Sequence, residues 1–310
     1  MNKEMLEEIS SLPPNIEKEL QKDIIQIMDR SGLFYRVFSR IKSPSSVEHK
    51  FTEHEMVNKS YSKDKKMQDI VGARIALYFK DDVEICRRLI ESTYDVVDLS
   101  EDIEDKTNFK PMRLNYVCRL PQDIKDLFTT GFFDKYFIDD TFELQIRTVF
   151  SEGWHEIEHD LRYKCKEDWN DEDELWRTMN GIFATLETCD WSILALFERL
   201  TYKMYKSSNW EAMIRNKLRM RLASEPLSAK IKEIIAEDKQ LAKDFLKLDR
   251  QRFVQAISAN KLSRVPKTLN NILFIANALF IHNSKLKEYS PGYILDMCEV
   301  YEHTGETQKS

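Results

Sequence analysis

In the segment FELQIRT (142–148), apolar and polar side chains alternate strictly from Phe142 to Arg147. Successive side chains of a β-strand point to opposite sides, so the apolar residues share one face. The other face carries Glu143, Gln145 and Arg147. A polar face of this kind is either exposed to solvent or lines a cleft where an acid and a cation act together. The segment therefore predicts a strand and leaves both uses of its polar face open.

The string HEIEH at residues 155–159 matches the His-Glu-x-x-His signature of zinc metallopeptidases. In that signature two histidines at i and i+4 of a helix bind zinc, with the glutamate as base. Here Glu158 and Asp160 place charges where a zinc-peptidase helix is usually apolar or neutral. No third ligand stands out downstream. We therefore favour another interpretation and keep a zinc peptidase as an alternative.

The remaining pattern predicts an α+β fold, with a mixed β-sheet flanked by helices. QDIVGARIALYF (68–79) is a near-continuous apolar run typical of a buried strand. RLNYVCRL (113–120) is another strand candidate, and a helix is expected after each of these two strands. From residue 151 onward nearly everything has a helical period. The chain has only 7 glycines and 8 prolines in 310 residues, which favours such long regular elements.

The same pattern predicts three regions. Residues 1–34 form an N-terminal helical segment, and residues 35–206 form a globular domain that carries the polar clusters. Residues 207–310 form a helical C-terminal domain without recognisable chemistry, and the boundary is expected near Ser207–Ser208.

Composition excludes several classes of protein. The net charge of −6 argues against non-specific coating of nucleic acid, although a local basic patch remains compatible with it. Five scattered cysteines without a Cys-x-x-Cys pair indicate reduced thiols. No window approaches the roughly 20 apolar residues that a transmembrane helix needs, and the acidic N-terminus is unlike a signal peptide. We expect a cytoplasmic protein that does not contact a membrane.

Four polar motifs occur in a fixed order along the chain. RIKSPSSVEHK (40–50) has Arg-x-Lys followed by serine and lysine, and QDIVGARI (68–75) has Asp-x-x-Gly-x-Arg. ELQIRT (143–148) leads into Glu-His-x-x-Arg-Tyr-Lys (158–164). Together they resemble the synthetase domain of the RelA/SpoT family, and the pattern is closest to the small alarmone synthetases, which lack a hydrolase domain.

The resemblance implies a reaction and its cofactor. An acceptor's ribose 3′-hydroxyl would attack the β-phosphate of ATP, transferring pyrophosphate to GDP or GTP and releasing AMP. The product would be (p)ppGpp, the alarmone of the stringent response. Such a transfer requires cations along the triphosphate, a Mg²⁺ ion and a carboxylate base.

The resemblance also assigns residues. Asp69 and Glu143 would be catalytic and would bind Mg²⁺. Substrate and phosphate binding would fall to Arg40, Lys42, Ser46, Lys50, Arg74, Gln145, Arg147, Lys110 and Arg113. Glu158, His159 and Arg162 would support the site. Strict alternation places Arg74 on the face opposite Asp69 unless Gly72 marks a bulge.

The acceptor loop departs from the family. KPMRLNYVCRL (110–120) replaces the usual Gly-Tyr-Arg-Ser-x-His. Aligning the arginines puts Met112 where the family's tyrosine stacks on guanine, and Tyr116 at the histidine. These two residues are therefore the candidate contacts to the acceptor base. Lys110 and Arg113 are either phosphate ligands or surface charges.

Two alternative functions follow from this departure. The first is a toxic relative that pyrophosphorylates another acceptor, such as the 3′ end of tRNA or an adenine nucleotide. The second is a catalytically degenerate regulator that binds nucleotide without transfer. The C-terminal helices are candidates for a homo-oligomer interface, for a neutralising module or for binding a target.

Overall fold

The computed structural model describes residues 3–56, 61–62, 65–101, 114–258 and 260–305. By its internal contacts the chain divides into two compact units, each described here by itself. The sheet unit comprises residues 1–27, 35–77 and 86–187, and the helical unit comprises residues 28–34, 78–85 and 188–310. The division differs from the boundary expected at Ser207–Ser208. Helix α8 (Asp173–Lys206) continues without a break through residue 187, so no linker separates the units there.

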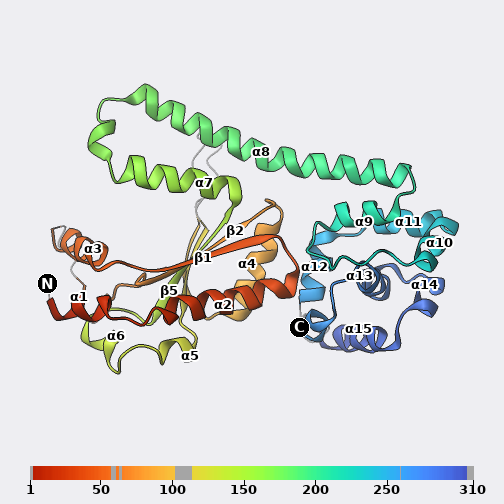
Figure 1. The fold of residues 1–310 in the computed structure, drawn as a ribbon, viewed down its shortest axis with the longest axis horizontal. Helices are drawn as coiled ribbons and strands as arrows, with labels where there is room; N and C mark the ends of the chain where they lie inside the picture. The colour runs from red at the N-terminus through yellow and green to blue at the C-terminus, as the bar shows by residue number, and fades with distance from the viewer. Residues whose placement is uncertain (1–2, 57–60, 63–64, 102–113, 259, 306–310) are drawn as a thin grey trace. The chain divides into compact units, whose positions relative to one another are not determined.

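A five-stranded sheet forms the centre of the sheet unit, in the order β1-β2-β5-β4-β3 (Figure 1). β2 and β5 are parallel and every other neighbouring pair is antiparallel, which confirms the predicted mixed sheet. The strands are β1 (Tyr35–Ile41), β2 (Val71–Leu77), β3 (Val96–Glu101), β4 (Leu114–Arg119) and β5 (Thr141–Thr148).

The sequence analysis identified β2, β4 and β5 but neither edge strand. β1 and β3 lie at the two edges of the sheet, and each pairs with one neighbour. Most residues of β3 are exposed or half-buried, so it lacks the apolar run that marks a central strand. β1 alternates, but its outward face carries charge and an aromatic ring, a pattern that is weak for a strand.

Helices cover both faces of the sheet (Figure 1). On one face lie α2 (Asn15–Ser31) and α4 (Asp82–Thr93), where Tyr94 packs edge-on against Phe142 with ring centres 5.2 Å apart. On the other face lies α7 (Val149–Glu158), which begins directly after β5. Thr148 caps this helix by accepting a hydrogen bond from the Ser151 amide. The strand thus passes into the helix without a loop, and polar residues of both share one face.

The sheet unit has further short elements. α7 continues as a π-helical turn (His159–Tyr163) and a 3₁₀ turn (Lys166–Trp169) before α8 begins. The other helices are α1 (Lys3–Ser10), α3 (Pro44–Met56), α5 (Gln122–Lys125) and α6 (Phe132–Lys135).

The helical unit confirms the predicted helical C-terminal region. Side chains of Asn209, Ser228, Asp238, Thr268 and Asn283 accept hydrogen bonds from backbone amides at helix starts. Its elements are α9 (Trp210–Leu218), α10 (Ala229–Glu237), α11 (Lys239–Lys247), α12 (Arg250–Ser258), a 3₁₀ turn (Asn260–Arg264), α13 (Leu269–Ala276), a π-helical turn (Asn277–Ile281), α14 (Ser284–Tyr289) and α15 (Gly292–Gly305).

A buried ion pair joins two segments of the helical unit. Arg250 lies 2.5 Å from Asp82, whose side chain is fully buried. The Arg250 Nε also donates to the Leu218 carbonyl at 2.6 Å. Burial raises the pKa of Asp82 to about 6, although the charge of Arg250 acts in the opposite direction. The pair joins Asp82 to the start of α12, and Arg250 also bonds the last residue of α9.

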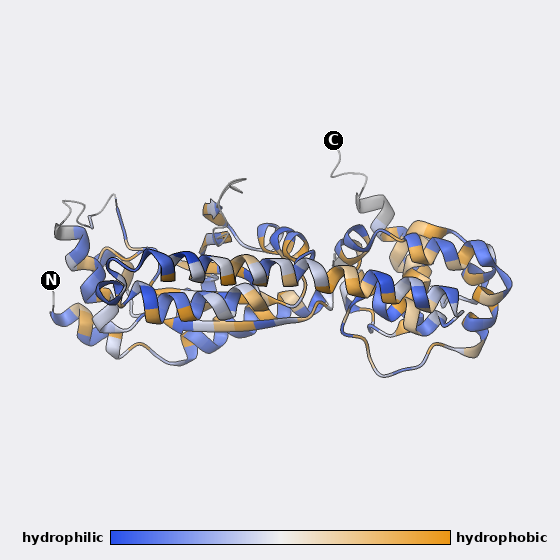
Figure 2. Cartoon of the chain, turned by 90° about the horizontal axis from the view of Figure 1, so that it is seen from above, coloured by the Kyte–Doolittle hydropathy of each residue, from blue (hydrophilic) through white to orange (hydrophobic). Residues whose placement is uncertain are grey.

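Polar and apolar residues alternate along the helices seen from above (Figure 2). On α8, Leu175, Ile182 and Leu196 are each about half exposed. None of the described helices is long and apolar enough to span a membrane. Homo-oligomerisation through the C-terminal helices stays a prediction.

Candidate functional site

The polar face of β5 is covered and internally bonded. The parallel register places Gln145 beside Arg74 of β2, so the two side chains share a face. The Gln145 amide oxygen accepts from Arg74 Nε at 3.0 Å and from Arg147 Nη2 at 3.2 Å. One amide therefore orients two guanidinium groups on the face that also carries Glu143.

The pairing of β2 explains why Arg74 faces this way. The register with β1 and β5 runs unbroken through Gly72, so there is no bulge. Asp69 precedes the first paired residue, Val71, and the alternation therefore does not extend back to it. Asp69 therefore lies before the strand, and the alternation of β2 does not determine which face Asp69 shares with Arg74.

Two glutamates of α7 complete the surroundings of Arg74, and the sequence analysis did not identify them. Glu152 and Glu156 both accept from Arg74 Nη1. They are four residues apart and therefore lie on the same side of the helix. That spacing just after a functional strand is the one sequence signal that indicates them.

Arg147 is the most buried cation of this face, with 8% of its surface exposed. Its Nε lies 3.9 Å from a Glu152 carboxylate oxygen. Burial, helped by the positive charge of Arg74, lowers the pKa of Arg147 to about 10. Its Nε and Nη1 are buried without a hydrogen-bond partner. Donors of this kind suit an anionic ligand, because desolvated donors gain most from a charged acceptor.

A second cluster joins two lysines to one carboxylate. Lys42 follows β1 and Lys50 lies on α3, and their Nζ atoms lie 2.6 and 2.5 Å from the same oxygen of Asp69. Burial alone would raise the pKa of Asp69, but the charges and hydrogen bonds of the two lysines outweigh it and lower that pKa. Burial also lowers the pKa of Lys42, and Asp69 offsets only part of this effect.

The other oxygen of Asp69 is buried and accepts no hydrogen bond. Two ammonium groups therefore meet one carboxylate that still has an open acceptor atom. The cluster carries a surplus of positive charge together with a free ligand atom for a cation.

Arg40 and Ser46 lie on the two sides of Lys42 in sequence. Arg40 pairs across to Gly72 in the β1–β2 register. A side chain at Gly72 would begin 3.9 Å from Arg40 Cγ, in ordinary contact. Ser46 lies at the start of α3, and its hydroxyl is 2.8 Å from that of Ser43. Arg40 therefore shares the face of Glu143, whereas Ser46 is bonded locally.

Glu143 has a partner that the sequence analysis missed. Asn115 of β4 donates from Nδ2 to Glu143 Oε1 at 3.2 Å. Alternation within LNYVCR already places Asn115 and Tyr116 on opposite faces, and this signal could have identified it.

The described residues contain no group of three or more His, Cys, Asp or Glu side chains placed to hold a metal ion. Mg²⁺ commonly takes only one or two protein carboxylates and completes its coordination with phosphates and water. Asp69, with its open acceptor oxygen, fits such a site. Glu143 is the carboxylate on the polar face of β5, where Asn115 holds one of its oxygens.

The acceptor side is largely outside the described residues, since Lys110, Met112 and Arg113 all fall there. Tyr116 is described and lies in the core, fully buried. Its hydroxyl donates to Glu91 of α4 at 2.9 Å, on the face away from Glu143. The structure therefore does not bring Tyr116 to the polar face.

An exposed aromatic ring lies on the polar face instead. Phe38 of β1 is 51% exposed and pairs across to Arg74 in the β1–β2 register. It stands between Arg36 and Arg40 on the outward side of an edge strand. The sequence signal was an aromatic residue among charged ones, and the sequence analysis did not use it.

The three supporting residues lie at the end of α7. Glu158 pairs with Arg162 at 2.6 Å, and the Arg162 guanidinium lies 4.1 Å from the centre of the Trp176 ring. His159 Nδ1 lies 2.9 Å from Asp160. Within the described part of the chain, these contacts join the end of α7 to the turn that follows it and to α8. They stabilise the helix that carries Glu152 and Glu156.

Comparisons with known proteins agree with the motif order. Residues 39–168 match a family model described as a region found in RelA / SpoT proteins. No curated protein matches the chain.

Solved structures also match. The small alarmone synthetase 1 from Bacillus subtilis is 22% identical, with a TM-score of 0.45, covering 58% of this chain and 88% of that one. The same protein bound to its product pppGpp gives 22% identity, a TM-score of 0.44 and coverages of 58% and 89%. A GTP pyrophosphokinase family protein from Streptococcus pneumoniae is 19% identical, with a TM-score of 0.44 and coverages of 62% and 92%.

Proposed function

We propose that residues 39–168, which match the RelA/SpoT family model, form a synthetase domain that transfers pyrophosphate from ATP to the 3′-hydroxyl of GDP or GTP. The observation that carries the proposal is the convergence of Lys42 and Lys50 on Asp69. Lys42 directly follows β1 and Asp69 lies two residues before β2, and the polar face of this sheet bears Glu143 and two arginines oriented by Gln145.

The donor triphosphate binds along the cationic side of this face. Arg40, Lys42 and Lys50 come from β1, the residue after it, and α3, so they can contact successive phosphates of one ATP. Two lysines face one carboxylate, so the cluster has one positive charge in excess that can attract an anionic ligand. Arg147 adds two desolvated N–H donors on the polar face of β5.

The transfer itself needs a base and an in-line acceptor. The acceptor's 3′-oxygen forms a bond to the β-phosphorus of ATP while the bond from that phosphorus to the α–β bridging oxygen breaks. AMP leaves with the electron pair, and the 3′-hydroxyl proton passes to Glu143. Asn115 holds one oxygen of Glu143 and leaves the other to accept this proton.

Mg²⁺, bound by Asp69 and Glu143 together with substrate phosphates, would neutralise charge that develops on the transferring group. The chain's own contribution there is the open oxygen of Asp69. Lys42 and Lys50 lower the pKa of that carboxyl against the effect of its burial, which favours its ionised form.

A second acceptor class is favoured by one observation. The alignment leaves Met112 at the stacking position, and Tyr116, the other candidate, is fully buried in the core. Recognition of the base by the expected aromatic is therefore missing from the described residues. A tRNA 3′ end or an adenine nucleotide, held through contacts beyond the base, is the alternative acceptor.

The test is to incubate the full chain and Mg²⁺ with ATP labelled in its γ-phosphate and with GDP, GTP, ATP or tRNA in turn. The proposal expects label in a 3′-pyrophosphorylated guanine nucleotide and release of unlabelled AMP. Label in tRNA or in an adenine product would replace the guanine acceptor but keep the reaction. ATP binding without a labelled product from any acceptor would favour the catalytically degenerate regulator.

A further inference from the structure

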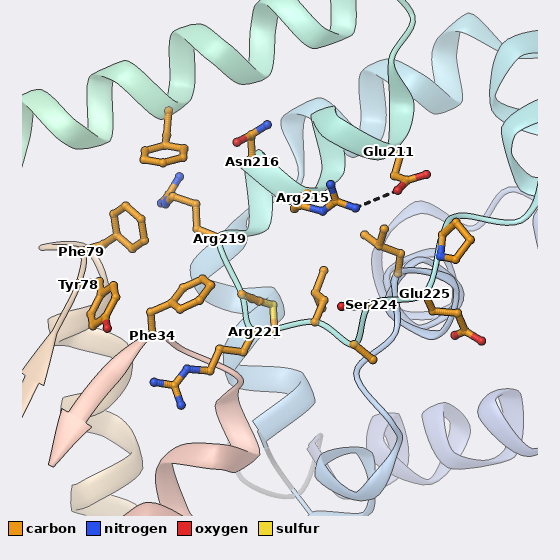
Figure 3. A pocket seen from close by; sticks show the side chains of 16 residues that line it. Phe34, Tyr78, Phe79, Glu211, Arg215, Asn216, Arg219, Arg221, Ser224 and Glu225 are labelled. Carbon is orange, nitrogen blue, oxygen red and sulfur yellow. Dashed lines mark hydrogen bonds and ion pairs between the residues drawn. The ribbon is translucent and has the colours of Figure 1, made fainter.

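The helical unit contains a pocket of about 890 Å³ that none of the chemistry above uses (Figure 3). Its walls are the end of α9, the extended segment 219–226 and four aromatic side chains. The Arg221 amide donates to the Gly32 carbonyl at 2.7 Å and the Ala223 amide to the Lys267 carbonyl at 2.9 Å. These hydrogen bonds tie the segment to other residues of the helical unit, so this wall of the pocket is held in place. The volume is in the range of small-molecule sites.

One side of the pocket is aromatic. Phe34 stacks on Tyr78 with ring centres 5.7 Å apart, and Phe79 meets Phe197 edge-on at 5.4 Å. In Figure 3 the labelled rings gather on the same side as Arg219. Such a surface favours a flat apolar or aromatic ligand body, through burial and stacking.

The same side carries cations. The Arg219 guanidinium lies 5.2 Å from the Phe79 ring centre, and that of Arg221 lies 5.9 Å from the Phe34 ring centre. Arg215, on the other side, is paired with Glu211 at 2.8 Å. Three arginines and two glutamates line the pocket, and Asp81, which pairs with Arg219, lies outside this lining.

The left-handed backbone of Arg219, with φ 47° and ψ 53°, ends α9 as its C-cap, where the Arg219 amide donates to the Arg215 carbonyl. One property of Arg219 points to a ligand. Its side chain is more than nine-tenths buried, and although it pairs with Asp81, its Nε is buried with no hydrogen-bond partner. A donor left in this state needs an acceptor that the protein does not supply.

We infer that this pocket binds a small organic anion with an aromatic body and a phosphate or carboxylate group. The aromatic body lies against the rings of Phe34 and Phe79. The anionic group accepts from Arg219 Nε and lies near the Arg221 guanidinium. Most lining residues lie outside residues 39–168, and the inference is independent of the proposed pyrophosphate transfer.

The first test uses the fluorescent aromatic anion 8-anilinonaphthalene-1-sulfonate, titrated into the full chain. We expect saturable binding that weakens roughly tenfold in Arg219→Lys, which keeps the charge but removes the Nε donor. Arg221→Ala, at an exposed position, should weaken it similarly and serves if Arg219→Lys does not fold. Lys230→Ala removes an exposed cation elsewhere in the helical unit and should leave binding unchanged.

The second test identifies the ligand class by displacement of bound dye. It follows the part of the dye binding that is present in the wild type and absent in Arg221→Ala. AMP or GMP should displace it, whereas inorganic phosphate and the uncharged nucleosides should not. Benzoate, as an aromatic carboxylate, separates phosphate from carboxylate as the preferred group. Equal dye binding by wild type and both arginine variants, or equal displacement by adenosine and AMP, would overturn the inference.

Discussion

Asp69 and Asp82 are both aspartates next to basic side chains, yet their pKa values move in opposite directions. Two lysines, each within 2.6 Å, outweigh the burial of Asp69 and lower its pKa. Asp82 is fully buried beside Arg250, and burial prevails and raises its pKa to about 6. The first group keeps an open acceptor atom in a partly exposed cluster, whereas the second joins segments of a core. Residue type therefore does not distinguish binding from structure, but the local excess of charge and the degree of burial do.

The largest expected effect is on turnover at the proposed transfer site. Glu143→Gln keeps the shape of the side chain but removes the base, so turnover should fall by about 10²–10⁴-fold with little change in ATP affinity. Labelled-ATP kinetics measure this, and thermal unfolding should be unchanged. Glu48→Gln, exposed on α3, is the matched control. Wild-type turnover in Glu143→Gln would remove this residue from the site.

The Asp82 side should respond in stability. Arg250→Ala leaves a buried carboxyl without its cation, so the free energy of unfolding should drop by about 3–5 kcal/mol. Urea titration measures the drop. Lys42→Ala should show the reverse pattern, with unfolding nearly unchanged and ATP use reduced on the order of 10²-fold. If Arg250→Ala and Lys42→Ala lower the free energy of unfolding equally, the two clusters do not differ in the way proposed here.

The opposite pKa shifts predict opposite pH dependence. Because Asp82 has a pKa of about 6 when folded and about 3.9 when unfolded, its stabilising contribution is complete below about pH 4 and is lost as pH rises through 6. The loss is about 3 kcal/mol, at 1.36 kcal/mol per pKa unit.

Asp82→Asn should lack this loss in urea titrations across that pH range. Asp69 contributes in the opposite sense, with stability present above its unfolded pKa and lost as pH falls through the folded one. A wild type that gains stability relative to Asp82→Asn between pH 4 and 6 would contradict the assignment.

The smallest expected effect is on acceptor selectivity, at a residue that belongs to neither cluster. It tests how far transfer depends on the acceptor base. Met112→Tyr restores an aromatic at the aligned stacking position, and stacking contributes roughly 1–3 kcal/mol per base. Transfer to GDP or GTP should rise relative to the other acceptors in a competition assay. Met112→Leu is the control. If the wild-type protein is already strongly guanine-selective, and neither Met112→Tyr nor Met112→Leu changes that selectivity, the loop is aligned incorrectly.

Sequence could predict what periodicity and motif order encode. The strand FELQIRT, the buried run of β2 and the helical C-terminal region follow from local pattern, and the sheet class follows from their order. The pairing of Arg74 with Glu152 and Glu156 depends on how α7 lies over the sheet, which no local pattern specifies. The alternation of β2 could not place Asp69 either, because the residue at which a strand begins depends on its pairing partners, and pairing here begins at Val71.

The core position of Tyr116 is a different case. Leu114 and Cys118 lie on the same side of β4, and the period of two already groups all three together. The alignment to a family motif drew attention to Tyr116 as a ligand and away from that simpler pattern. Phe38 shows the converse, since no motif contained it, although its exposure is unusual for a large aromatic side chain.

The parallel pairing of β2 with β5 has a consequence for the order of folding. Arg74 and Gln145 are 71 residues apart, and Arg74 and Glu156 are 82 apart. Contacts between such distant residues form slowly, because a long loop must close first. During synthesis β1 and β2 emerge early. The polar face around Arg74 and Gln145 cannot assemble until the chain through Glu156 has left the ribosome. Under the proposed chemistry, an unfinished chain already holds its lysines yet consumes no ATP.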